Sequence, residues 1–96
     1  MTREEFFETI PAHRAEMDSM GIKSIGVFGS VARNEARPDS DVDVLIEFNR
    51  RIGLFGFAGV QRRLSELLGV RVDLTTPDGI KPRFKEHILS ETRYAA

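Results

Sequence analysis

The sequence predicts an α+β fold in which helices flank a small mixed β-sheet, and two observations support this prediction. Three stretches rich in β-branched residues, Ile22–Phe28, 41–48 and 70–75, have the length and pattern of strands. The segment Leu54–Leu68 instead has apolar residues at spacings of three and four, which is typical of an amphipathic helix. With 96 residues, the chain is expected to form one domain, residues 1–96, around one modest core.

The N-terminal segment predicts helices on both sides of a proline. Thr2 is expected to cap the first helix, whose opening turn carries acidic residues. Because proline fits the first turn of a helix, Pro11 is expected to begin a second helix or a kinked continuation over residues 11–20. Gly21 is expected to stop this helix before the first strand.

The middle of the chain predicts two strands joined by a polar loop. The first strand, Ile22–Phe28, ends at Gly29, and residues 30–33 can open a short helix. Residues 34–40 form a loop that delivers the chain to the second strand at residues 41–48.

The C-terminal half predicts a helix, a strand and a last helix. The stripe on Leu54–Leu68 ends at Gly69, and Phe55 and Phe57 are expected mainly in the core, although part of this cluster could face a protein partner. The strand at 70–75 alternates with period two, so Val70, Val72 and Leu74 should point inward and Arg71 and Asp73 to the other face. Residues 77–79 form a turn, 81–90 a helix with Phe84 and Ile88 as an apolar pair, and 91–96 a tail.

The composition argues against nucleic-acid binding, cysteine chemistry and a membrane location. A net charge of -1 gives no basic excess for direct nucleic-acid binding, and the absence of cysteine excludes disulfides and thiolate catalysis. The longest weakly polar stretch, 52–60, is too short to cross a bilayer, so no membrane association is expected. We expect a cytoplasmic protein whose site uses oxygen ligands.

The most informative motif pairs a phosphate-binding turn with two carboxylates. Gly29 and Ser30 lie where a strand meets a short helix, and backbone N–H groups at such a turn can bind a phosphate. Asp41 and Asp43 begin the next strand, and side chains two residues apart on a strand share a face. Such a pair can bridge divalent cations, which predicts metal-dependent nucleotidyl transfer.

A third carboxylate arrives on another strand as Asp73. Two Mg²⁺ ions can hold the attacking and leaving oxygens of an in-line phosphoryl transfer, and Mg²⁺ prefers carboxylate and phosphate oxygens. In this interpretation Asp41 and Asp43 bridge the metals, and Asp73 completes the metal nearer the nucleophile and accepts its proton. Gly29 allows the triphosphate close to the backbone, and Ser30 adds a hydroxyl contact. Arg33 could contact the triphosphate or equally face solvent, so it is left outside the catalytic set.

Segments 29–33 and 40–43, together with Asp73, resemble the minimal nucleotidyltransferase (MNT) family of the DNA polymerase β superfamily. The likeness covers nearly the whole chain and implies a polymerase β-like nucleotidyltransferase fold. One departure is Asn34, which stands where the family usually has glycine. If that position needs a left-handed backbone, asparagine is the next best residue after glycine.

The resemblance also implies a function. Small members of the family act as antitoxins beside a HEPN-domain ribonuclease toxin, which implies transfer of AMP from ATP to a hydroxyl, expected to be a tyrosine, of that toxin, within a hetero-oligomer. A binding module that neutralises its partner by occlusion is the alternative. Modification of a small molecule ranks lower, because the chain is expected to have no further domain to shape an acceptor pocket.

Overall fold

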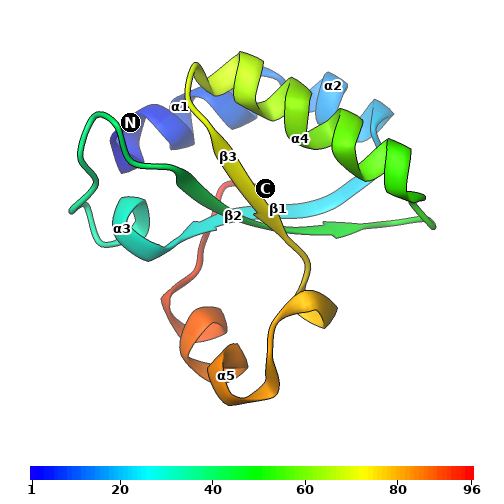
Figure 1. Ribbon diagram of the computed structural model, residues 1–96. Coiled ribbons are helices and arrows are strands. Elements are labelled where there is room, and N and C mark those ends of the chain that lie inside the picture. Colours follow the sequence, from blue (N-terminus) through cyan, green and yellow to red (C-terminus); the bar gives the residue numbers. More distant parts are fainter.

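The computed structural model describes residues 1–96 and contains one four-stranded sheet in the order β3-β2-β1-β4 (Figure 1). In chain order the elements are α1 (Arg3–Ala12), α2 (Arg14–Ser19), β1 (Ile22–Phe28), α3 (Gly29–Ala32), β2 (Val42–Phe48), α4 (Leu54–Leu68), β3 (Val72–Thr75), the short 3-10 helix η1 (Pro77–Gly79), α5 (Pro82–Glu91) and β4 (Arg93–Tyr94). Strands β1 and β2 are antiparallel, β2 and β3 are parallel, and β1 and β4 are antiparallel. The predicted mixed sheet with flanking helices is therefore confirmed. None of the helices is long and apolar enough to cross a membrane.

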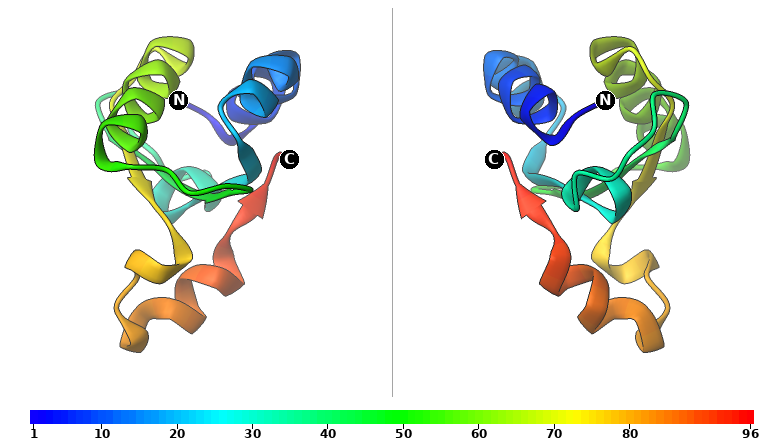
Figure 2. Two further views of the ribbon diagram at one scale, coloured as in Figure 1. Left: turned by 90° about the vertical axis from the view of Figure 1, so that its right-hand side faces the viewer. Right: turned by 90° about the vertical axis from the view of Figure 1, so that its left-hand side faces the viewer.

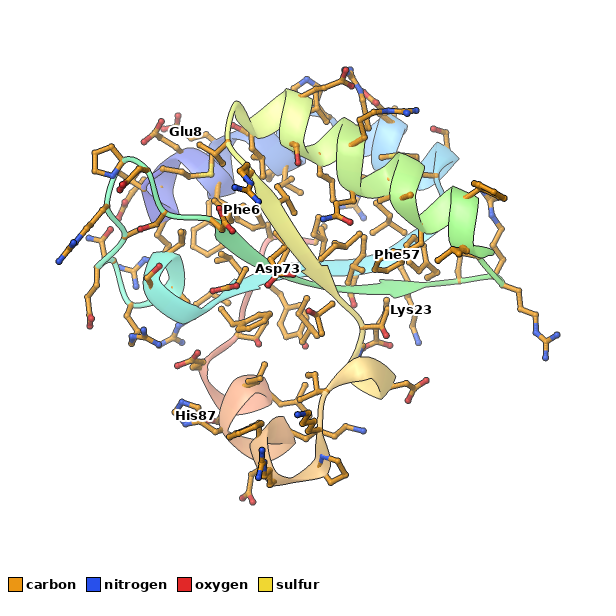
Figure 3. The ribbon with its side chains drawn as sticks, in the orientation of Figure 1. Phe6, Glu8, Lys23, Phe57, Asp73 and His87 are labelled. Carbon is orange, nitrogen blue, oxygen red and sulfur yellow. The ribbon has the colours of Figure 1, made fainter.

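The two faces of the sheet are covered by different helices. Helices α1, α2 and α4 lie on one face, while α5 and η1 lie on the other (Figures 1 and 2). The core fills the first face, where Val44 of β2 is fully buried beside Phe6 of α1 and Leu64 of α4. Figure 3 shows Phe6 and Phe57 between the sheet and the helices above it. The opposite face carries the buried Leu45 and, two residues before it on the same strand, Asp43 of the candidate site.

Helix α1 begins as the sequence predicts, but it ends later. The Thr2 hydroxyl accepts a hydrogen bond from the Glu5 N–H at 3.1 Å, and the Glu5 carboxylate accepts one from the Thr2 N–H at 3.0 Å, which makes a capping box. Pro11 does not begin a new helix, because α1 continues through it to Ala12. A proline in the last turn removes only one helical hydrogen bond, so α1 can include it. The helix ends just beyond Pro11, where the His13 N–H donates a hydrogen bond to the Ile10 carbonyl at 3.0 Å.

Strand β3 is shorter than predicted. It begins at Val72, so Val70 lies in the preceding turn, where it is partly buried against the core. Side chains of α4 satisfy the outer edge of the strand: the Ser65 hydroxyl accepts from the Val72 N–H at 3.2 Å, and the Gln61 amide donates to the Val72 carbonyl at 2.8 Å. This pairing protects an edge strand that would otherwise expose free backbone groups.

The C-terminal residues form a strand that the sequence did not predict. Tyr94 pairs with Gly26 and Arg93 with Val27, so β4 extends the sheet beside β1. Gly26 makes this possible, since a Cβ there would lie 2.8 Å from the Thr92 side chain and 2.9 Å from the Arg93 carbonyl oxygen. Two residues are too few for a period-two pattern to be visible in the sequence.

Phe55 and Phe84 are both exposed. Phe55 is 92% exposed and not in the core, because it lies on the side of α4 opposite Phe57, about 200° around the helix. Phe84 and Ile88 both lie in α5 at the predicted spacing, but no residue of that helix is buried and Phe84 is 47% exposed. Asn34, in contrast, has the left-handed backbone expected of it, with φ 59°.

Candidate functional site

Asp43 and Asp73 are the centre of the site. They are directly paired residues of the parallel strands β2 and β3, so their side chains leave the same face of the sheet. That face is the one away from the core, because their neighbours Val42, Val44 and Leu74 all point into the core on the other side. Figure 3 shows Asp73 near the middle of the molecule, between the core helices and α5. The structure thus brings together two of the three predicted carboxylates by strand register alone.

Asp41 lies near this pair but in a different setting. It stands one residue before β2 and is exposed, with its Oδ1 3.8 Å from Nε of Arg71. A cavity of about 250 Å³ between the start of β3 and α4 joins it to Asp73. This cavity is lined by Asp41, Gln61, Ser65, Arg71, Val72 and Asp73. Asp41 therefore lies at the rim of the site, beside the guanidinium group of Arg71, which is itself exposed to solvent.

Gly29 forms the floor of the site beside Asp43. Its φ is 69°, in the left-handed region that favours glycine, and a Cβ at this position would lie 2.3 Å from Oδ2 of Asp43. No side chain can occupy that space without moving the carboxylate. Ser30 follows at the start of α3, half-buried, and its carbonyl accepts a hydrogen bond from the Glu35 N–H at 2.8 Å. Gly29 thus adjoins Asp43, and Ser30 is the next residue along the turn.

Burial and neighbouring acids both act on Asp43. Burial raises the pKa of Asp43, and the nearby carboxylates of Asp73, Asp41 and Glu91 raise it further, while Arg33 acts in the opposite direction. A carboxyl group held this way binds a proton more tightly than an ordinary one, and its charged form is favoured by a nearby cation. Perturbed carboxyl groups of this kind are a feature of functional sites.

Glu91 is the site residue that the sequence did not reveal. It lies at the C-terminal end of α5, and its Oε1 accepts a hydrogen bond from the Gly29 N–H at 2.9 Å. Its Oε2 lies 3.1 Å from a guanidinium nitrogen of Arg33 and 3.5 Å from Nε2 of His87. Glu91 and Gly29 are separated by 62 residues in the sequence, and only the path of α5 brings them together. No sequence pattern could have indicated this contact.

The donor set suits a hard divalent cation that is shared with a phosphorylated substrate. No group of three or more His, Asp or Glu side chains is arranged to hold an ion without further ligands. Mg²⁺ commonly takes one or two carboxylates and completes its shell with water and substrate phosphates, which matches the pair Asp43 and Asp73 with Asp41 at the rim.

Comparison with known proteins agrees with this arrangement. Residues 10–95 match the family described as nucleotidyltransferase domain. The chain is 39% identical over 95 residues to the protein adenylyltransferase MntA of Thermococcus cleftensis, covering 98% of this chain and 96% of the relative. A solved structure proposed to be a minimal nucleotidyltransferase superimposes with a TM-score of 0.82 at 39% identity, covering 97% of this chain and 95% of the other. A toxin-antitoxin crystal structure with AMP-PNP shares the fold, with a TM-score of 0.70 at 12% identity over 100% of this chain and 73% of the other.

Proposed function

Because the chain belongs to the nucleotidyltransferase domain family and is a nucleotidyltransferase, we propose that it transfers AMP from ATP to a hydroxyl of a partner HEPN ribonuclease toxin and so acts as an antitoxin. The observation that carries this proposal is the pairing of Asp43 with Asp73 across two parallel strands, beside the turn at Gly29. The acceptor hydroxyl is expected to be a tyrosine. We place the reaction in the cytoplasm, where ATP is available as the donor.

The cofactor proposed is Mg²⁺, held by Asp41, Asp43 and Asp73. When bound, two such ions neutralise charge on the reacting phosphate and hold the attacking and leaving oxygens. The carboxylates of Asp43 and Asp73 face the same space, and Asp41 joins Asp73 along the cavity at the rim. This division supports different roles for the acids: Asp43 lies deepest, beside Gly29, while Asp73 is exposed toward an incoming acceptor.

The residues of this chain then act as follows. The acceptor oxygen attacks the α-phosphorus of ATP, the bond from that phosphorus to the bridging oxygen breaks, and pyrophosphate leaves. Asp73, which is exposed, accepts the proton of the acceptor hydroxyl. The Gly29 N–H and the Ser30 hydroxyl bind phosphate oxygens, and Gly29 allows the close approach because no Cβ separates the backbone from the site.

The proposed donor and partner have support from related proteins. The Thermococcus cleftensis relative, of nearly equal length, is named a protein adenylyltransferase, which supports AMP as the transferred group. The toxin-antitoxin structure with the same fold contains AMP-PNP, an ATP analogue, which supports ATP as the donor and a toxin as the partner. We therefore expect a hetero-oligomer of this chain with its toxin.

A toxicity-rescue experiment separates catalysis from occlusion. Cells that express the toxin are given the wild type, a variant with both Asp41→Asn and Asp43→Asn, or a control with Asp39→Asn in the exposed loop before β2. If AMP transfer is the mechanism, the double variant loses neutralisation while it still binds the toxin in a pull-down, and the control rescues fully. Full rescue by the double variant would support neutralisation by occlusion and contradict the proposal.

A further inference from the structure

The carboxylate of Glu91 occupies one of the two contacts that we assign to a phosphate, the N–H of Gly29, and it also contacts Arg33. It accepts the Gly29 N–H at 2.9 Å, and Arg33 donates to both of its oxygens, at 3.1 Å and 3.4 Å. Backbone N–H groups and guanidinium groups are the donors that phosphate oxygens use, and a carboxylate offers the same charge and acceptor geometry. Only 16% of the Glu91 side chain is exposed, so the contact is built into the fold.

The phosphate-binding N–H of Gly29 is already occupied in the structure. Gly29, Ser30 and Asp43 are each partly exposed, but none of them lines one of the four cavities on the surface of the molecule. A nucleotide triphosphate cannot reach the Gly29 N–H while the Glu91 oxygen is bonded to it. Phosphate binding therefore requires this one side chain to move.

The helix that carries Glu91 is weakly held. None of the residues of α5 is buried, and Phe84 and Leu89 remain exposed on it. In Figures 1 and 2 the helix lies below the sheet, away from the packed helices on the other face. Its side-chain hydrogen bonds to Gly29 and Arg33, on and just after α3, are made by Glu91. A helix with so little buried apolar surface can shift at small cost.

We propose that Glu91 is an internal competitor for the triphosphate, so that α5 closes the site when it is empty and is released when nucleotide binds. This inference rests on the proposed function, because it names a regulation of the same nucleotide site. A triphosphate brings more negative charge and more acceptor oxygens to the Gly29 N–H and Arg33 than one carboxylate does. The site thereby couples nucleotide occupancy to the position of α5.

Calorimetric titration with AMP-PNP and Mg²⁺ tests this competition. The variants are Glu91→Gln, which removes the charge but keeps the size, and Glu86→Gln as a matched control on the same helix, exposed to solvent. The competition predicts that Glu91→Gln binds AMP-PNP about three- to tenfold more tightly than the wild type, since one charge-assisted contact no longer opposes binding. The control should bind as the wild type does.

Hydrogen exchange of the wild type provides a second readout that does not depend on a variant. Saturation with AMP-PNP should speed exchange of the backbone amides of Pro82–Glu91, because α5 is released, while amides of β2 exchange more slowly. Equal or weaker binding of AMP-PNP by Glu91→Gln, or slower exchange in α5 on binding, would overturn the proposed competition. In that case, binding of AMP-PNP by the wild type would still agree with the proposed function. If neither protein binds AMP-PNP, the proposed function fails and the competition fails with it.

Discussion

Asp43 and Asp73 face each other across two hydrogen-bonded parallel strands, on the side of the sheet that the core does not use. Like charges placed directly opposite each other in a sheet are destabilising, so the fold keeps this pair at a cost to its stability. The raised pKa of Asp43 has the same origin, in burial and in the neighbouring acids. A site of this kind is suited to a cation that removes the repulsion.

The first prediction is that Asp43→Asn stabilises the protein when divalent cations are absent. Because the pKa of Asp43 is raised in the folded state, folding binds a proton more tightly there, and stability falls as pH rises from the ordinary pKa of an aspartate through the raised one. At pH 7 the variant lacks this penalty, so its melting temperature in EDTA should exceed that of the wild type by a few degrees. Thermal unfolding followed by circular dichroism measures this difference.

The pH dependence supplies the check on that prediction. At about pH 3 Asp43 is protonated in both states of the wild type, so the two melting temperatures should converge. Mg²⁺ should raise the melting temperature of the wild type more than that of the variant, because bound ligand stabilises the folded state. A variant that is less stable than the wild type at pH 7 without cations would show that the repulsion is not the dominant effect.

The second prediction concerns Gly29→Ala. The added Cβ would lie 2.3 Å from Oδ2 of Asp43, and φ at this residue is 69°, so the variant must shift both the turn and the carboxylate. We expect a loss of about 1–3 kcal/mol in stability from the backbone strain and loss of AMP transfer. Chemical denaturation and an activity assay measure the two effects. The matched control is Gly59→Ala in α4, where no atom lies within 4 Å of the added Cβ, and it should keep full activity.

The third prediction tests how β4 docks. Gly26→Val would place its side chain against Thr92, Arg93 and Tyr94, the segment that pairs with β1. The strand should detach, which would speed hydrogen exchange in residues 92–96 and lower stability, while the core face keeps its protection. Because Glu91 precedes this segment, detachment should also weaken its contact with Gly29. Unchanged exchange at the C-terminus would contradict this account of the sheet.

The fourth prediction concerns the ion pair that joins α2 to α4. Glu16 and Arg63 form a bidentate ion pair, in which Nη2 of Arg63 donates to Oε1 of Glu16 at 3.0 Å. The hydrogen bond from Arg63 holds the pKa of Glu16 below its ordinary value. The stability that this pair contributes is therefore present above the ordinary pKa of a glutamate and is lost as pH falls through the lowered one. Denaturation of Glu16→Gln should show a deficit at pH 7 that disappears under strongly acidic conditions. A deficit that is independent of pH would contradict the prediction.

Much of the fold and the centre of the site could be predicted from local patterns. Period-two alternation is visible in one sequence, and it places Asp43 and Asp73 on the face opposite Val44 and Leu74. The capping box at Thr2 is equally local. The partnership between the two aspartates then needs only that their strands be neighbours, which a helical crossover between them favours.

The remaining features depend on long-range packing. The contact of Glu91 with Gly29 joins residues 62 apart and arises only from the position of α5. Strand β4 exists because the C-terminal residues meet an open sheet edge beside Gly26. The exposure of Phe55 follows from the orientation of α4, which composition alone does not determine.

Intact-mass spectrometry of the proposed toxin partner most directly tests the claim that these aspartates catalyse AMP transfer. The proposed HEPN-domain partner is incubated with this protein and Mg-ATP, beside reactions with EDTA and with the double variant Asp41→Asn and Asp43→Asn. The account predicts mass increments of whole AMP groups on the partner with the wild type and Mg²⁺, and none in the other two reactions. An unmodified partner that nevertheless forms a stable, neutralised complex with the wild type would contradict it.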